Sequence, residues 1–392
     1  MKRSVTEYPL AGKRVLMRVD FNVPLVGASV ADDTRIKAAL PTLQYLLDQG
    51  CSIVLVTHLG RPNGQVVAGL RMDPVAARLA ELLGQPVKMA DECIGERVEA
   101  RAAALAPGEI LLLENVRFYP QETANDPEFA RQLASLADVY VNDAFGCAHR
   151  AHASTEGVAH LLPALSGLLM QRELEMLGAL LSDPEHPFVV VLGGSKVTDK
   201  IGVIERLLPI ADAILIGGAM CFPLLKAAGH AIGNSKLEME ALDIAGELLA
   251  KISASPCEFL LPVDLVVAAE PVAETPSSIV FADAIPADMM GLDIGPETIA
   301  AFAERIGSAR TLFWNGPMGL FEVDEFARGT ESVGRAISAS EAISIAGGGD
   351  TVRAIQQFAI GAGISHISTG GGASMEYLEG KALPGVAALL DS

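Results

Sequence analysis

Side chains that bind anions recur in the first half of the chain, where short apolar stretches give way to polar residues. The first such break is Arg18-Val19-Asp20-Phe21-Asn22-Val23-Pro24. Later breaks carry one histidine and several arginines: Arg35, His58, Arg61, Arg117 and Arg150. A guanidinium group stays charged, and its planar fork matches two oxygens of a phosphate or carboxylate. Because the formal net charge is −19, the pattern predicts a local basic site for a small anion in an otherwise acidic protein.

The second half of the chain carries glycine clusters after apolar runs: Gly193-Gly194, Gly217-Gly218, Gly347-Gly348-Gly349 and Gly370-Gly371-Gly372. Glycine lets the backbone approach a ligand closely, and N–H groups at a helix start bind phosphate. We expect Gly193 and Gly194 to let backbone N–H groups approach a phosphate, although a tight strand-to-helix turn is the alternative. No GxxxxGK[ST] sequence occurs, so this is not a Walker A motif. Two halves with different anion-binding features indicate transfer between two phosphorylated ligands.

Length and composition limit the fold and the classes of partner. A chain of 392 residues exceeds the usual size of one hydrophobic core, so two domains are expected. Half of the residues are apolar and only 20% are charged, which suits tightly packed α/β layers. The net negative charge argues against a general nucleic-acid binder, because affinity for a phosphate backbone depends on clustered Lys and Arg.

The cysteines and the N-terminal residues indicate the cellular compartment in which the protein is expected. Five cysteines are scattered and none forms a CxxC pair, so we expect buried thiols in a reducing compartment, without disulfides or metal. The N-terminus lacks the apolar core of a signal peptide. No apolar run approaches the roughly 20 residues of a membrane helix. A soluble, cytoplasmic protein that does not contact a membrane is therefore expected.

Apolar runs of strand length alternate with Ala/Leu-rich segments of helical length. The runs lie at residues 14–19, 52–57, 110–113, 139–141, 188–192, 213–216, 259–267, 311–314, 343–346 and 366–368. Many are continuously apolar, which is typical of strands covered on both faces. The alternation predicts parallel βαβ units with right-handed crossovers. Ligands bind at the carboxyl ends of such strands, which is where the cations and glycines occur.

The domain boundary is expected at a helix over residues 165–181 and the Pro-rich turn at 182–187. The turn precedes a new apolar run, so a second sheet is expected to begin there.

Several longer motifs resemble phosphoglycerate kinase. In the first half they are RVDFNVP (18–24), DDTRI (32–36), HLGRP (58–62), LLLENVRF (111–118) and NDAFGCAHRAHAS (142–154). In the second half they are GGSKVTDKI (193–201), LPVDLVV (261–267), WNGPMGLFE (314–322), AGGGDT (346–351), STGGGAS (368–374) and EGKALPG (379–385). The resemblance runs in family order from about residue 14 to the C-terminus. One departure is Asn234, where the family commonly has lysine.

The resemblance implies an α/β fold of two Rossmann-like lobes, each a parallel sheet flanked by helices, joined by a hinge helix. Residues 1–168 would form the lobe that binds 3-phosphoglycerate, and the tail 383–392 would return to it. Residues 169–187 would form the interlobe helix and hinge, and residues 188–382 the lobe that binds the Mg-nucleotide.

The activity implied is reversible phosphoryl transfer between 1,3-bisphosphoglycerate and ADP, giving 3-phosphoglycerate and ATP. Transfer would be direct and in line after hinge closure, with Mg²⁺ bound to ATP or ADP. The resemblance also implies a monomer.

The substrate residues implied by the resemblance are Asp20, Asn22, Arg35, His58, Arg61, Arg117 and Arg150. Any one arginine, taken alone, would more simply be a surface charge. The attacking oxygens are already ionised at pH 7, so His58 is expected to be a hydrogen-bonding contact and not a general base. A structural imidazole is the alternative.

The nucleotide residues implied are Lys196, Lys200, Gly217, Asn315, Pro317, Glu322, Gly348, Gly349, Asp350 and Thr351. Asp350 would also hold Mg²⁺, because magnesium uses few carboxylates together with phosphate oxygens. An N-cap role for Asp350 is the alternative, and both roles are compatible. The catalytic groups implied are Arg35, Lys200, Gly371 and Gly372.

Two other functions fit parts of the pattern. A Rossmann dehydrogenase shares the architecture, but it requires GxGxxG and an acidic residue about 20 positions further on, a fingerprint that we do not find. A non-catalytic nucleotide-binding protein of the same fold is the second alternative. The retained Arg35, Lys200 and Asp350 argue against it.

Overall fold

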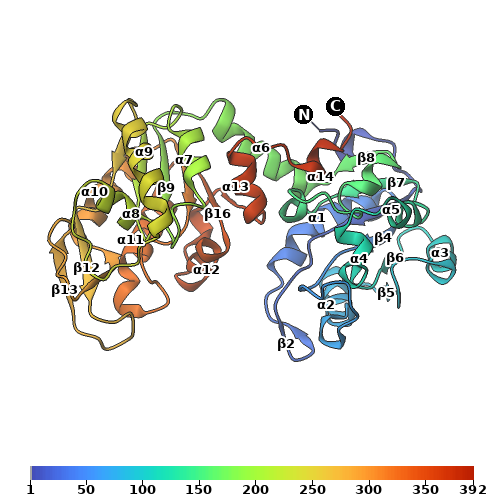
Figure 1. The fold of residues 1–392 in the computed structure, drawn as a ribbon. Helices are drawn as coiled ribbons and strands as arrows, with labels where there is room; N and C mark the ends of the chain where they lie inside the picture. Colours follow the sequence, from blue (N-terminus) through green and yellow to red (C-terminus); the bar gives the residue numbers. More distant parts are fainter. Residues whose placement is uncertain (1) are drawn as a thin grey trace. The chain divides into compact units, whose positions relative to one another are not determined.

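The computed structural model describes residues 2–392, which divide into two compact units. The first unit comprises residues 2–175 and 381–392, and the second comprises residues 176–380. Each contains a parallel sheet with helices packed around it (Figure 1). The predicted α/β fold class with two Rossmann-like lobes is confirmed.

The sheet of the first unit has six parallel strands in the order β5-β6-β4-β1-β7-β8. Its strands are β1 (Arg14–Arg18), β4 (Ser52–Val56), β5 (Val87–Met89), β6 (Ile110–Leu112), β7 (Val139–Asn142) and β8 (Ala164–Ser166). A separate hairpin is formed by β2 (Leu25–Val26) and β3 (Ser29–Val30). All residues of β4, β6, β7 and β8 are buried, as expected for strands covered on both faces.

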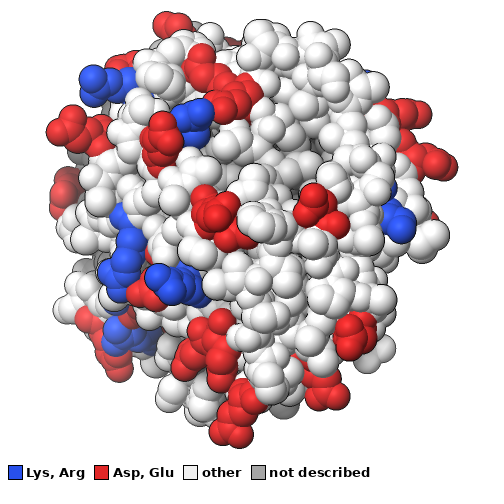
Figure 2. Space-filling view, turned by 90° about the vertical axis from the view of Figure 1, so that its left-hand side faces the viewer, with Lys and Arg blue, Asp and Glu red and all other residues white. Residues whose placement is uncertain are grey.

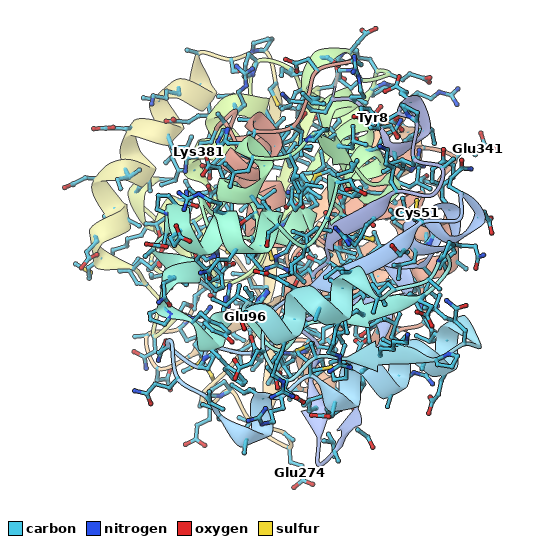
Figure 3. The ribbon with its side chains drawn as sticks, turned by 90° about the vertical axis from the view of Figure 1, so that its right-hand side faces the viewer. Tyr8, Cys51, Glu96, Glu274, Glu341 and Lys381 are labelled. Carbon is cyan, nitrogen blue, oxygen red and sulfur yellow. The ribbon has the colours of Figure 1, made fainter. Side chains whose placement is uncertain are left out.

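The helices of the first unit are α1 (Thr34–Asp48), α2 (Asp73–Leu83), α3 (Glu96–Ala103), α4 (Pro120–Thr123), α5 (Pro127–Ala134) and α14 (Pro384–Ala387). Short 3₁₀ turns are η1 (Val5–Glu7), η2 (Ala68–Leu70), η3 (Val116–Phe118), η4 (Phe145–Cys147) and η5 (Gly157–His160). Figure 3 shows this unit with its side chains, including Glu96 at the start of α3 and the buried Cys51 before β4.

The second unit contains two sheets. Six parallel strands run in the order β11-β10-β9-β15-β16-β17. They are β9 (Phe188–Leu192), β10 (Ala213–Ile216), β11 (Glu258–Leu260), β15 (Thr311–Asn315), β16 (Ile343–Gly347) and β17 (His366–Ile367). An antiparallel sheet, in the order β13-β12-β14, consists of β12 (Asp264–Ala268), β13 (Ser277–Phe281) and β14 (Met290–Ile294).

One expected strand is wrong. The run 259–267 is not continuous, because β11 belongs to the parallel sheet and β12 to the antiparallel one. Pro262 lies between them and has no N–H to donate to a ladder, which favours a break at this point.

The helices of the second unit are α7 (Ile201–Leu207), α8 (Cys221–Ala227), α9 (Leu242–Ser253), α10 (Pro296–Ser308), α11 (Arg328–Ala339), α12 (Gly349–Gln357) and α13 (Gly372–Leu378). Its 3₁₀ turns are η6 (Met239–Ala241), η7 (Asp324–Phe326) and η8 (Gly361–Gly363). Within residues 2–392, no helix is long and apolar enough to cross a membrane. On the face shown in Figure 2, acidic side chains are widely spread and basic ones gather in few places.

Helix α6 (Leu168–Ser182) belongs to both units, since the boundary follows Glu175. It begins later than the expected helix at 165–181, because Ala164–Ser166 form β8 instead. The boundary between the two units therefore lies inside this helix.

The C-terminal segment packs on the first unit. Leu390 N donates to Ala164 O (2.9 Å), and Arg3 N donates to Leu390 O (2.8 Å). The side chain of Asn142, at the end of β7, donates to Gly385 O (3.0 Å). These bonds join residues 381–392 to β8 and to the carboxyl end of β7.

The buried carboxylate of Asp143 accepts hydrogen bonds from backbone N–H groups at the start of helix α6. Oδ1 of Asp143 accepts hydrogen bonds from Leu169 N (3.0 Å) and Met170 N (3.2 Å). Its Oδ2 has no hydrogen-bond partner among the described residues. Burial raises the pKa of Asp143 from 3.8 to about 6.

Replacing Asp143 by asparagine should remove a pH-dependent part of the unfolding free energy of the first unit. An acid with a raised folded pKa binds more protons when folded, so it makes the unfolding free energy fall as the pH rises from about 4 to about 6. The fall should be about 3 kcal/mol, since one pKa unit corresponds to about 1.4 kcal/mol. Relative to the wild type, Asp143→Asn should gain this amount between pH 4 and pH 7, as measured by amide hydrogen exchange of β7.

The control is Asp126→Asn, which makes the same substitution at the N-cap of α5. Asp126 accepts a hydrogen bond from Phe129 N (2.8 Å) and is only half-buried. An equal pH-dependent gain in this variant would contradict the assignment to burial of Asp143.

Candidate functional site

The carboxyl ends of neighbouring parallel strands gather the polar residues of the first unit. Asp20 and Asn22 follow β1, His58 follows β4, and Arg117 follows β6. Since β1, β4 and β6 are hydrogen-bonded neighbours pointing the same way, these side chains meet at one edge of the sheet.

Asp20 and Asn22 hold Arg35, which projects from α1. The Nη1 atom of Arg35 lies 3.1 Å from Asp20 Oδ2 and donates to Asn22 O at 3.1 Å. Asn22 Oδ1 also accepts the N–H of Gly60 (2.8 Å). The side chain of Arg35 is 37% exposed, so the guanidinium is oriented by the protein while part of it faces solvent.

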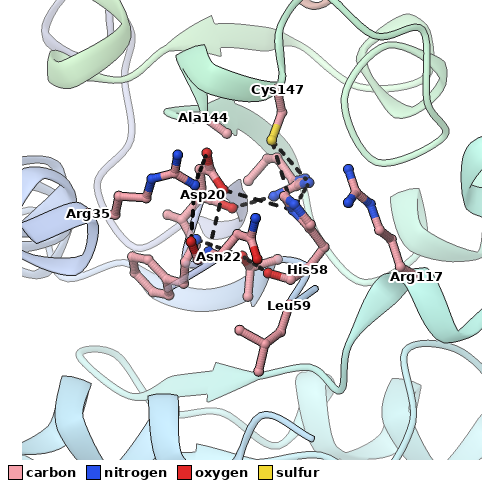
Figure 4. Close-up of polar contacts among 12 residues, drawn as sticks. Asp20, Asn22, Arg35, His58, Leu59, Arg117, Ala144 and Cys147 are labelled. Atoms are coloured by element: carbon pink, nitrogen blue, oxygen red, sulfur yellow. Dashed lines mark hydrogen bonds and ion pairs between the residues drawn. The ribbon is translucent and has the colours of Figure 1, made fainter. Parts of the chain in front are cut away.

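Arg117 lies across the site from Arg35, with Asp20 and His58 between them (Figure 4). It is buried, and its Nη1 donates to Gly60 O at 3.0 Å. Nε is a buried donor that no described residue pairs with. An unsatisfied buried donor costs about 1–3 kcal/mol, and an anionic ligand would remove that cost. The cation is therefore poised to bind an anion.

The other two predicted arginines differ in their surroundings. Arg150 is half-buried, and its Nε donates to His149 Nε2 (3.1 Å). Its charge helps to lower the pKa of both His58 and Arg117. Arg61 is exposed, and no described hydrogen bond or ion pair joins it to the other site residues. The structure thus brings together the predicted substrate residues except Arg61. Arg61 is linked to them by its neighbour in sequence, Gly60, which bonds Asn22 and Arg117.

Arg18 was not among the predicted site residues. It is 1% exposed, and its Nη2 lies 3.2 Å from His58 Nδ1. The available signal was an arginine at the end of strand β1, directly after three apolar residues. Ligand atoms of Asp20, His58 and Cys147 lie within 4.8 Å of one another, as a metal site requires. The cationic guanidinium of Arg18 already contacts the histidine and the thiol, so we assign no metal there.

In the second unit, the strand ends line one continuous cleft. Its first part, about 320 Å³ in volume, has an apolar wall of Phe222, Leu265, Met290, Leu292, Met318 and Leu320. Its second part is polar and is lined by Lys196, Lys200, Asn315, Gly349, Gly371 and Gly372. Both parts share Gly194, Ser195, Pro317 and Asp350. An apolar wall beside a glycine- and lysine-lined wall suits a ligand with a flat base at one end and phosphates at the other.

Lys200 is held at the polar end of this cleft. Its Nζ contacts Asn315 Oδ1, while Asn315 Nδ2 donates to Gly347 O (2.8 Å). The second bond fixes the orientation of the amide and presents its oxygen to the lysine. Burial lowers the pKa of Lys200 to about 8. Lys196, four residues earlier, is exposed.

Gly193 and Gly194 line the polar part of the cleft, but their own N–H groups are bonded within the protein. Gly193 N donates to Asn315 O (3.0 Å) and Gly194 N to Pro317 O (2.8 Å), so neither amide is free for phosphate. A Cβ atom on Gly193 would lie 2.1 Å from Pro317 O. These glycines instead allow the ends of β9 and β15 to approach each other closely. Gly217 likewise donates to Leu192 O (2.9 Å), and its neighbour Gly218 lines the cleft.

The start of α12 offers free backbone donors. The N-cap is Gly348, with φ 97°, so the N-cap interpretation of Asp350 is wrong. The first amide used within the helix is that of Val352, which donates to Gly348 O (3.0 Å). Thr351 Oγ1 accepts Gly316 N (2.7 Å), and the exposed Asp350 lies 3.8 Å from Arg353. The amides before Val352 therefore face the cleft without intrahelical partners.

Glu322 lies at the apolar part of the cleft and pairs with Arg353 at 2.8 Å. Its carboxylate is about half exposed, which leaves oxygens for a ligand hydroxyl.

Comparison with known proteins decides the family. The family model for phosphoglycerate kinase matches residues 5–381. The chain belongs to the phosphoglycerate kinase family. A phosphoglycerate kinase from Moorella thermoacetica is 56% identical over 390 residues, covering 100% of this chain and 99% of the relative. One from Pelotomaculum thermopropionicum is 54% identical, with the same coverage.

Solved structures of phosphoglycerate kinases are similar to this chain over nearly its whole length. Phosphoglycerate kinase from Coxiella burnetii has a TM-score of 0.91 at 39% identity, covering 99% of this chain and 98% of the other. The enzyme from Pyrococcus horikoshii has a TM-score of 0.86 at 32% identity, with the same coverage. The predicted membership of the phosphoglycerate kinase family and the predicted enzyme class are confirmed. Neither the dehydrogenase nor the non-catalytic alternative finds support.

Lys200 should react with an amine-specific acylating reagent at unusually low pH. Its pKa of about 8 means that the neutral, reactive amine accumulates through pH 8, well below the ordinary value of 10.5. Mass spectrometry of nucleotide-free protein should show a half-maximal rate near pH 8, and bound ATP should protect the residue. Lys251 is the control, because its pairing with Glu205 raises its pKa. Equal pH profiles for the two lysines would contradict the effect of burial on Lys200.

Proposed function

We propose that the chain transfers a phosphoryl group reversibly between 1,3-bisphosphoglycerate and ADP, giving 3-phosphoglycerate and ATP. The observation that carries the proposal is the match to the phosphoglycerate kinase family over residues 5–381. The two strand-end sites, one basic and one with an apolar and a glycine-lined part, provide separate places for the two ligands.

In this proposal the first unit binds the glycerate. The side chains that would contact it are Asp20, Asn22, Arg35, His58, Arg61, Arg117 and Arg150. The unpaired Nε of Arg117 and the oriented guanidinium of Arg35 support an anion between them. Asp20 and Asn22 would meet the hydroxyl of the substrate.

The second unit binds the nucleotide. Adenine would lie against the apolar wall, and Glu322 would accept a ribose hydroxyl. The phosphates would lie along Lys196, Lys200, Asn315 and the start of α12, at Gly348, Gly349 and Thr351. Gly217 and Pro317 would help to shape the cleft. Asp350 would hold Mg²⁺ with phosphate oxygens, since its exposed carboxylate stands beside the free amides of α12.

The chemistry is mainly an electrostatic problem. Two unit charges 4 Å apart repel by about 1 kcal/mol in water and about 4 kcal/mol near a protein surface. Arg35, Lys200 and the amides of Gly371 and Gly372 would offset this repulsion as the phosphoryl group passes in line between the ligands. Bound Mg²⁺ would neutralise further phosphate charge. No general base is needed, because the attacking oxygens are ionised at pH 7.

Direct transfer requires the two bound ligands to meet, so we propose hinge closure through α6, the helix that both units share. Closure would also exclude water, which would otherwise hydrolyse the acyl phosphate. We further propose a monomer in the cytoplasm. The five cysteines are free and buried, which fits a reducing compartment.

Replacing Arg35 by alanine should lower kcat by roughly 10²–10³-fold, the scale of losing one donor to a developing charge. Steady-state kinetics with 3-phosphoglycerate and ATP measure this. Lys37→Ala is the matched control, because Lys37 is an exposed cation on the same helix, paired with Asp33. An unchanged kcat in Arg35→Ala would refute the catalytic assignment.

Removing divalent metal with EDTA should abolish turnover, and excess Mg²⁺ should restore it. In Asp350→Asn the Mg²⁺ concentration needed for half-maximal activity should rise at least about 10-fold, because altering even an outer-shell partner of a metal ligand costs about that much affinity. Asp324→Asn, an exposed acid of the same unit, should leave it unchanged. A normal Mg²⁺ requirement in Asp350→Asn would show that this carboxylate does not hold the metal.

A further inference from the structure

The guanidinium of Arg18 lies in a closed set of protein contacts beneath the substrate site. Its Nε donates to Ser154 Oγ (2.9 Å), and its Nη1 contacts Val19 O. Its Nη2 faces both His58 Nδ1 (3.2 Å) and Cys147 Sγ (3.6 Å). A guanidinium group carries donors only, so every partner must accept.

A buried carboxylate balances this cation. Glu122 is 0% exposed, and its oxygens accept Ser154 Oγ (2.6 Å) and Ser154 N (2.9 Å). The Ser154 hydroxyl therefore accepts from Arg18 and donates to Glu122, which links the two charges. Buried charges persist when they are paired and hydrogen-bonded, so Arg18 is fixed in place by the fold.

The position of Arg18 decides where the His58 ring carries its proton. Because Nδ1 faces a group that can only donate, Nδ1 must present its lone pair, and the proton must be on Nε2. The described contacts of the ring all involve Nδ1, which leaves Nε2 for a ligand. In the opposite tautomer, an Nδ1–H would meet the Arg18 donors, and the Nε2 lone pair would repel an anion.

We propose that Arg18 is a positioning residue that holds His58 as the Nε2–H tautomer, so that the ring donates a hydrogen bond to the anionic substrate. The nature of that anion rests on the proposed function, whereas the tautomer of the free protein does not. Arg18 itself is occupied by Ser154, His58 and Cys147 and acts through the histidine.

The ring stays neutral because several cations surround it. Burial lowers the pKa of His58 well below 6.5, and nearby positive charge lowers it further. The charged and titratable groups that face the ring from the neighbouring elements are Arg18, Asp20, Arg35, Arg117, Cys147 and Arg150. We therefore expect no imidazolium between pH 6 and pH 8.

The test is a two-bond ¹H–¹⁵N NMR spectrum of ligand-free protein labelled in its histidines, with His58→Gln used to identify the signal. The wild type should show the Nε2–H tautomer at pH 6 to 8. In Arg18→Met alone, the buried Glu122 loses the charge of Arg18 and keeps His152 (3.7 Å) as its nearby titratable partner, so this variant is expected to fold poorly. The informative variant is therefore Arg18→Met/Glu122→Gln. In it the proton should move to Nδ1, because Asp20 Oδ1, 3.9 Å away, becomes the best partner of that nitrogen.

The matched control is Arg71→Met/Glu114→Gln, which removes another Arg–Glu pair of the first unit (2.8 Å) that does not contact His58. Its His58 spectrum should match that of the wild type. A wild-type ring protonated on Nδ1 or on both nitrogens would overturn the inference, as would an Nε2–H tautomer that persists in Arg18→Met/Glu122→Gln.

Kinetics supply a second readout. In Arg18→Met/Glu122→Gln, KM for 3-phosphoglycerate should rise by at least about 10-fold, the factor for one hydrogen bond to a charged group, with kcat little changed. An unchanged KM would overturn the role of the Nε2–H donor. A tautomer that shifts as expected, in a protein without turnover of 3-phosphoglycerate, would support the positioning role and contradict only the proposed function.

Discussion

Mutual repulsion between two phosphorylated ligands is the constraint that both sites must satisfy, in a protein that is itself strongly acidic. In the proposed function, the first unit meets it with guanidinium groups, and burial of these groups has a consequence. Arg18 needs Glu122 as a counter-ion, while Arg117 keeps a buried donor that has no partner among residues 2–392. In the same proposal, the second unit meets this constraint with fewer charged side chains, through Lys200 and the amides at the start of α12.

Parallel sheets allow a small number of charged and polar groups to form each site. Strands such as β4 and β9 are buried along their whole length, so polar groups are confined to the loops at their ends. Since the strands are parallel, residues far apart in sequence arrive at one edge. Gly60 illustrates the result, because its N–H bonds Asn22 and its carbonyl bonds Arg117. The backbone of one loop thus holds side chains that follow two other strands.

The long buried strands could be predicted from sequence because short, continuously apolar runs between helical segments are typical of strands covered on both faces. The short strands β2, β3, β5 and β8 and the antiparallel strands β13 and β14 were missed. The strands β11 and β12 were joined across Pro262. The motifs predicted residues that the structure brings together at the strand ends, but they did not show what Gly193 and Gly194 do. A glycine needed for approach to a ligand and one needed for approach between strands look the same in sequence. Only the bonds to Asn315 O and Pro317 O distinguish the two roles.

The roles of the arginines could not be separated from sequence for a similar reason. Each follows or ends an apolar run, yet their partners differ. Arg18 is surrounded by Ser154, His58 and Cys147, so it cannot turn toward a ligand without breaking these contacts and removing its charge from the neighbourhood of the buried Glu122. Arg117 bonds only a backbone carbonyl through Nη1 and retains a donor for an anion. The two arginines therefore differ in whether protein acceptors already bond their guanidinium donors. Arg18, whose donors are bonded, holds a histidine in place, whereas Arg117 is available to bind an anion.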